Sequence, residues 1–68
     1  MDVYSCGVLL CEMCIRELPV PERFDEQISS MTKKELRNLV RQCTNKEPVD
    51  RPRMKDVVFT LQGLIKPI

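Results

Sequence analysis

The sequence predicts an all-α fold with three main helices, over about residues 2–17, 33–44 and 52–65. Apolar residues recur at helical spacing in the second and third segments, and the first segment is apolar on nearly every side. No stretch of similar length alternates apolar and polar residues as a strand does. With 68 residues, of which 43% are hydrophobic and 31% charged, the chain has a globular composition and is treated as one unit, residues 1–68.

The first helix is predicted from Asp2, whose charge suits the positive end of the helix dipole, to Glu17. Pro19 and Pro21 then prevent the helix from continuing. Glu12 and Arg16 are spaced for an i,i+4 ion pair. A helix this apolar belongs inside a large core. The apolar positions that cover most of its circumference are Val3, Tyr4, Val8, Leu9, Leu10, Met13 and Ile15.

The connector over residues 18–31 is polar, with two apolar anchors, Phe24 and Ile28. A short helical turn is predicted over residues 25–30.

The second helix carries the clearest local pattern. The segment Thr32–Glu35 fits a capping box, and Met31 and Leu36 are spaced for a hydrophobic staple around it. The proline at 48 ends the segment. The predicted apolar face consists of Leu36, Leu39, Val40 and Cys43.

The third helix is predicted to open at Pro52, a favoured first-turn residue. Gly63 and the Lys66-Pro67 pair are expected to close it. Its predicted apolar stripe consists of Met54, Val57, Val58, Leu61 and either Leu64 or Ile65.

Charge and cysteine content exclude several classes of function. Eleven basic and ten acidic residues leave a net charge of +1, which does not favour binding to nucleic acid. The first helix is too short and too charged to span a membrane, and the start lacks the pattern of a secretory signal. The four cysteines, Cys6, Cys11, Cys14 and Cys43, are expected to be reduced, buried core thiols rather than metal ligands, since no histidine accompanies them.

Two segments resemble protein kinases. Residues 2–13, DVYSCGVLLCEM, are similar to the D-V-[WY]-S-F-G-V-L-L-x-E-[MI] segment of the helical C-terminal lobe. The segment Cys43-x4-Pro48-x-Asp50-Arg51-Pro52-x-Met54 is similar to the C-x4-P-x-x-R-P segment near the end of that lobe. The residues of these two motifs are most similar to those of the tyrosine-kinase-like and tyrosine kinase groups. The resemblance implies the C-terminal subdomain of a two-lobed kinase fold.

The resemblance implies roles for particular residues. Asp2 would bond the catalytic-loop backbone, and Arg51 would pair, while buried, with the glutamate of the A-P-E motif. Leu9 and Met13 match the base of the hydrophobic column that the adenine ring completes. Glu12 matches an acidic position that helps read basic substrates in some kinases. The positions with an implied structural role are Asp2, Gly7, Arg51 and Pro52.

The chain contains none of the motifs that hold nucleotide, metal and acceptor hydroxyl, namely G-x-G-x-x-G, V-A-I-K, H-R-D-x-x-x-x-N, D-F-G and A-P-E. We therefore expect no catalytic residue, no cofactor and no phosphoryl transfer from these 68 residues alone. ATP and Mg²⁺ are implied for an intact parent kinase, which would phosphorylate Ser/Thr or Tyr hydroxyls of a protein substrate. The sequence favours neither Ser/Thr nor Tyr as the acceptor.

The expected partner is the upstream part of the kinase domain, with no nucleic acid and no membrane contact in this segment. Because the partners of Asp2 and Arg51 would lie upstream, the isolated chain is expected to be molten, self-associating or dependent on missing sequence. The expected location is the cytoplasm, or the cytoplasmic side of a membrane receptor. The alternatives are a pseudokinase remnant that acts as a helical interaction module, and an unrelated small helical bundle.

Overall fold

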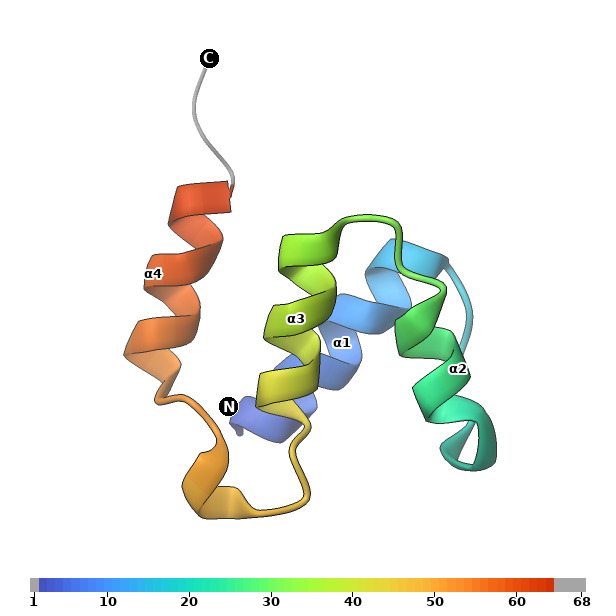
Figure 1. The fold of residues 1–68 in the computed structure, drawn as a ribbon, viewed down its shortest axis with the longest axis horizontal. Helices are drawn as coiled ribbons and strands as arrows, with labels where there is room; N and C mark the ends of the chain where they lie inside the picture. The colour runs from blue at the N-terminus through green and yellow to red at the C-terminus, as the bar shows by residue number, and fades with distance from the viewer. Residues whose placement is uncertain (1, 65–68) are drawn as a thin grey trace.

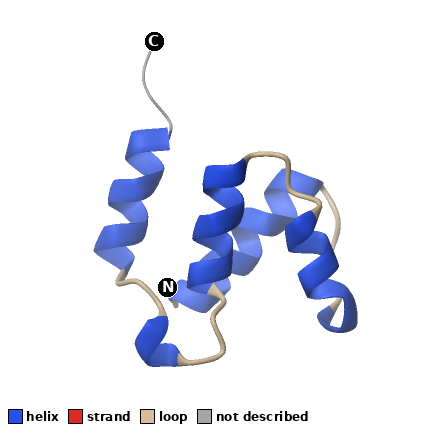
Figure 2. Ribbon diagram, viewed as in Figure 1, coloured by secondary structure: helices blue, strands red, loops and turns tan. Residues whose placement is uncertain are grey.

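A computed structural model describes residues 2–64 of the chain, and every described regular element is a helix (Figures 1 and 2). The predicted all-α fold is confirmed. The elements are α1 (Val3–Ile15), η1 (Pro21–Arg23), α2 (Phe24–Ser29), α3 (Lys34–Cys43), η2 (Pro48–Asp50) and α4 (Met54–Leu64). Figure 1 shows α1 crossing behind α3, with α2 and α4 on opposite sides of α3.

Helix α1 ends two residues earlier than predicted. Arg16 takes the left-handed conformation, with φ 59° and ψ 37°, and its N–H donates to the Glu12 carbonyl at 2.8 Å. This left-handed cap closes the helix before Pro19 is reached. The predicted Glu12–Arg16 ion pair does not form. Within residues 2–64 the salt bridge is between Arg23 and Glu26. Because Arg16 has left the helical conformation, it no longer has the i,i+4 geometry of a helix face.

The connector is helical, as predicted, in its second half. Phe24 begins α2 and is half-buried, and Ile28 is buried in the core. The N-terminal boundary of α3 differs from the prediction. Its N-cap is Lys33, with no side-chain cap hydrogen bond, so the capping box at Thr32 does not form. The Lys33 carbonyl accepts from the Arg37 N–H at 2.9 Å, which starts the helix one residue later.

Helix α4 begins at Met54, where the Arg53 carbonyl accepts the first hydrogen bonds, from Asp56 and Val57. Pro52 therefore precedes the helix instead of opening it. Gly63 lies inside α4 and does not end it. The predictions for Ile65 and for Lys66-Pro67 fall outside the described residues.

The core is small and consists of two adjoining clusters. The first joins α1, α2 and α3 through Cys11, Ile28, Met31 and Val40, and the second joins α3 and α4 through Leu39, Cys43 and Val57. Leu10 of α1 packs against both clusters. Met31 and Leu36, the predicted staple pair, belong to the first cluster. The predicted apolar faces of α3 and α4 therefore form the core, except that Val58 is 45% exposed.

Candidate functional site

A groove lies between α1, the start of α2 and the residues after α3. Its volume is about 670 Å³, and we call it the α1–α2 groove. Its lining from α1, the connector and α2 is mainly apolar but includes the acidic residues Glu22 and Asp25, and Arg41 and Lys46 line it at the α3 end. The apolar lining residues are Tyr4, Val8, Pro19, Pro21, Phe24 and Ile28.

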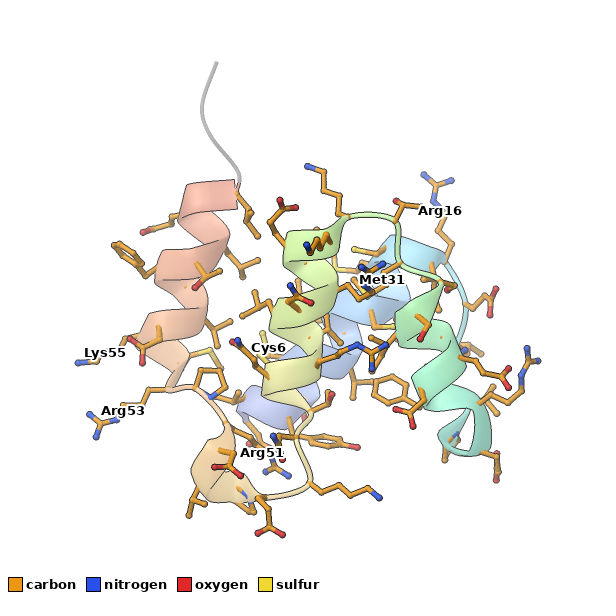
Figure 3. The ribbon with its side chains drawn as sticks, in the orientation of Figure 1. Cys6, Arg16, Met31, Arg51, Arg53 and Lys55 are labelled. Atoms are coloured by element: carbon orange, nitrogen blue, oxygen red, sulfur yellow. The ribbon has the colours of Figure 1, made fainter. Side chains whose placement is uncertain are left out.

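Arg51 lies against α1 and makes two contacts (Figure 3). Its guanidinium carbon is 4.9 Å from the centre of the Tyr4 ring, a cation–π distance, and its Nε donates to the Asn45 carbonyl at 2.7 Å. Arg51 is half-buried, and within residues 2–64 it has no carboxylate partner. Sequence reasoning missed the Tyr4–Arg51 contact, because the two residues are far apart in the chain.

A second uncovered surface lies on the side of α1 that faces away from α3. Leu9 is 44% exposed and Met13, one turn later, is 66% exposed. Asp2, the N-cap residue of α1, is exposed and makes no side-chain cap hydrogen bond, whereas Glu12 is half-buried. The sequence predicts that α1 carries more apolar surface than a core of this size covers. In the structure only Gly7 and Cys11 of α1 are buried, so most of its apolar residues are at least partly exposed.

Gly7 of α1 is buried against the C-terminal end of α3. A Cβ atom at this position would be 2.7 Å from Cys43 Cβ and 2.9 Å from Thr44 Cγ2. Only a residue without a side chain allows this approach. Pro52, which follows Arg51 in the chain and also has an implied structural role, is half-buried.

The cysteines divide by exposure. Cys11 and Cys43 are buried as predicted, Cys6 is half-buried, and Cys14 is exposed, so the prediction was wrong for Cys14. Burial raises the pKa of Cys11, and it raises the pKa of Cys43 to about 11, with a smaller contribution from Cys6. Among the described residues no group of three or more candidate side chains is arranged to hold a metal ion.

Gln27 is the buried polar residue that the sequence pattern did not reveal. Its Oε1 accepts from the Val20 N–H and its Nε2 donates to the Leu18 carbonyl, both at 2.9 Å. Pro19 and Pro21 have no N–H, so Val20 carries the backbone donor between them. The Gln27 amide thereby holds the connector against α2. A residue in a polar stretch carries no signal for this long-range role.

No protein-family model and no solved structure matches the chain. Among curated proteins, it is similar to the dual specificity protein kinase shkC of Dictyostelium discoideum, with 31% identity over 78 aligned residues. The similarity is to a protein kinase. The alignment includes 94% of this chain but 15% of that kinase, so the chain spans a small part of the relative's length.

No helix within residues 2–64 has both the length and the hydropathy needed to cross a membrane.

Proposed function

We propose that the chain is the C-terminal part of the helical lobe of a protein kinase domain, where it supplies scaffold and not catalysis. The observation that carries this proposal is α1, an apolar helix that the helices packed against it leave uncovered on two sides. The kinase similarity, which extends over 94% of the chain, gives the second line of support.

The exposed side chains of α1 agree with the roles that the resemblance implies. Leu9 and Met13, the two positions assigned to the base of the adenine-completed column, form the exposed apolar surface opposite α3. In the parent, upstream helices would cover them. The α1–α2 groove, beside Tyr4, would receive a further upstream segment, with Arg51 nearby to meet its acidic residue.

The parent would transfer the γ-phosphoryl group of ATP, with Mg²⁺, to a hydroxyl of a protein substrate. The relative's name says that it has dual specificity, and we propose no choice between Ser/Thr and Tyr acceptors for the parent. Because the reaction uses ATP, the proposed location is the cytoplasm or the cytoplasmic side of a membrane. Glu12 remains the candidate for reading basic substrate residues.

A second candidate, a pseudokinase remnant that acts as an interaction module, is favoured by the α1–α2 groove alone. Its volume of about 670 Å³ is in the range of small-molecule pockets. The two candidates differ in what lies upstream: an intact kinase needs H-R-D, D-F-G and A-P-E motifs, and a remnant would carry degraded ones.

The experiment has two parts. First, an antibody against the chain identifies the size and upstream sequence of the protein that carries it; we expect a longer product with the three motifs. Second, the purified 68-residue chain is assayed with Mg²⁺-ATP and a mixed Ser, Thr and Tyr peptide library, and we expect no phosphorylation. Phosphoryl transfer by the chain alone, or a carrier protein that has no kinase motifs, would overturn the proposal.

A further inference from the structure

The corner between α2 and α3 brings a serine and two arginines together. Arg41 of α3 donates from Nη2 to the Oγ of Ser29, the last residue of α2, at 2.8 Å, and both side chains are exposed. Arg37, one turn earlier on α3, donates from Nη1 to the Met31 carbonyl at 3.2 Å. Figure 3 labels Met31 at this corner. Two guanidinium groups thus lie along residues 29–31.

This positive charge is not compensated by a carboxylate. Neither Arg37 nor Arg41 takes part in an ion pair within the described chain. Of the acidic residues nearby, Glu35 precedes Arg37 by two positions and Asp25 lines the same groove as Arg41, but neither forms an ion pair with these arginines. Glu26 is paired with Arg23 at 3.2 Å. The acceptor that Arg41 uses is a neutral hydroxyl, although guanidinium groups bind anionic oxygens more strongly.

Ser29 differs from the neighbouring Ser30. The Ser30 hydroxyl donates to the Gln27 carbonyl at 2.6 Å, so it is turned back onto α2. The Ser29 hydroxyl instead points across to α3, where a larger anionic group would remain in contact with Arg41.

We propose that Ser29 is a phosphorylation site whose phosphate is held by Arg41, with Arg37 adding positive potential. An ATP-dependent protein serine kinase acts on the chain. The Ser29 Oγ forms a bond to Pγ, and the bond from Pγ to the bridging β,γ oxygen breaks. ADP leaves, and the hydroxyl proton passes to the base of that kinase. A phosphoserine carries close to two negative charges and three acceptor oxygens. Ser29 is the last residue of α2, where the helix dipole and the nearby Asp25 and Glu26 disfavour an anion, so any ordering of this segment would come from Arg41 and Arg37.

The modification would act on the α1–α2 groove, because Arg41 also lines it. A phosphate on Ser29 would hold the Arg41 guanidinium at the α2–α3 corner and reduce the positive charge at that end of the groove. The Ser29–Arg41 and Met31–Arg37 contacts carry this inference, and it does not depend on the kinase proposal.

The chemical test uses the complete chain, synthesised with phosphoserine at position 29 or, as the matched control, at position 30, each with and without Arg41→Gln. The acid dissociation constant of each phosphate is measured by ³¹P NMR, and helix content by circular dichroism. We expect the constant at position 29 to exceed that at position 30 by about threefold or more, with higher helix content, since a facing cation favours the dianion. Arg41→Gln should abolish both differences. Equal constants and equal helix content at the two positions would overturn the inference.

The cellular test examines the tryptic peptide 24–33, which contains Ser29, Ser30 and Thr32, from cells that express the chain with phosphatases inhibited. Fragmentation spectra assign the modified hydroxyl, and we expect phosphate on Ser29. Phosphate confined to Ser30 or Thr32, or no phosphate on the peptide, would contradict the inference.

Discussion

At the residue scale, Gly7 sets how closely α1 approaches α3. In Gly7→Ala the new methyl would be 2.7 Å from Cys43 Cβ, so the helices must separate. We expect a loss of about 1–3 kcal/mol in the free energy of unfolding, measured by urea denaturation. Gly63→Ala is the matched control, because a Cβ there meets nothing within 4 Å and α4 gains a better helix former. That variant should be more stable by about 0.5–1 kcal/mol. Equal effects of the two substitutions would contradict the packing at Gly7.

Cys43 gives a prediction that depends on pH. Its pKa is raised from 9.0 to about 11 by burial, because the core disfavours the thiolate. At pH 8 the thiolate is therefore roughly a hundredfold rarer than in the unfolded chain, so iodoacetamide should modify exposed Cys14 first. The raised pKa makes the folded state bind the proton more tightly. The resulting stability is complete below pH 9.0 and is lost as the pH rises toward about 11. Mass spectrometry of the alkylated chain follows the order, and modification of Cys43 before Cys14 at pH 8 would contradict it.

At the element scale, the start of α3 can be tested directly. Lys33 is the N-cap residue and contributes no cap hydrogen bond, so Lys33→Asp should supply one to the first turn. We expect about 0.5–2 kcal/mol of added stability in urea denaturation. Thr32→Ala should have little effect, since Thr32 lies one residue before the cap. If Thr32→Ala destabilises the chain and Lys33→Asp does nothing, the helix starts at the capping box after all.

The connector depends on one side chain. Gln27→Ala removes both hydrogen bonds that hold Leu18 and Val20, and leaves their backbone groups without partners in the protein. We expect a cost of about 1–3 kcal/mol and faster hydrogen exchange at the Val20 amide, measured by NMR. The control is Gln42→Ala on the exposed side of α3, which should leave both quantities unchanged. An unaltered Val20 exchange rate in Gln27→Ala would show that the amide does not hold the connector.

At the scale of the whole molecule, the exposed apolar surface on α1 predicts self-association of the isolated chain. Leu9 and Met13 are 44% and 66% exposed on one helix face, and a core of this size supplies only about 3–5 kcal/mol. We expect the sedimentation coefficient to rise with concentration, and the double variant Leu9→Gln/Met13→Gln to flatten that rise. Val49→Gln, at an isolated position in η2, serves as the control and should behave like the unmodified chain. A sedimentation coefficient that stays constant as the concentration rises would contradict the prediction.

The three main helices, the helical turn in the connector and the apolar faces of α3 and α4 are predictable from the sequence. Helix formation and the spacing of apolar residues depend on neighbours within a few positions, so the pattern is readable locally. The helix boundaries are predicted less accurately. α1 ends at Arg16, which adopts the left-handed conformation, and α3 begins after Lys33, because each helix end depends on the backbone conformation of a single residue.

The contacts between residues far apart in the chain follow from how the helices pack. The closeness of Gly7 to Cys43, the Tyr4–Arg51 stacking, the Gln27 bridge and the Ser29–Arg41 contact all join residues that no local pattern relates. Each depends on the angle and distance at which helices pack, which the whole set of side chains sets together. The apolar circumference of α1 was readable from the sequence, but which of its sides stays uncovered was decided by where α2, α3 and α4 pack.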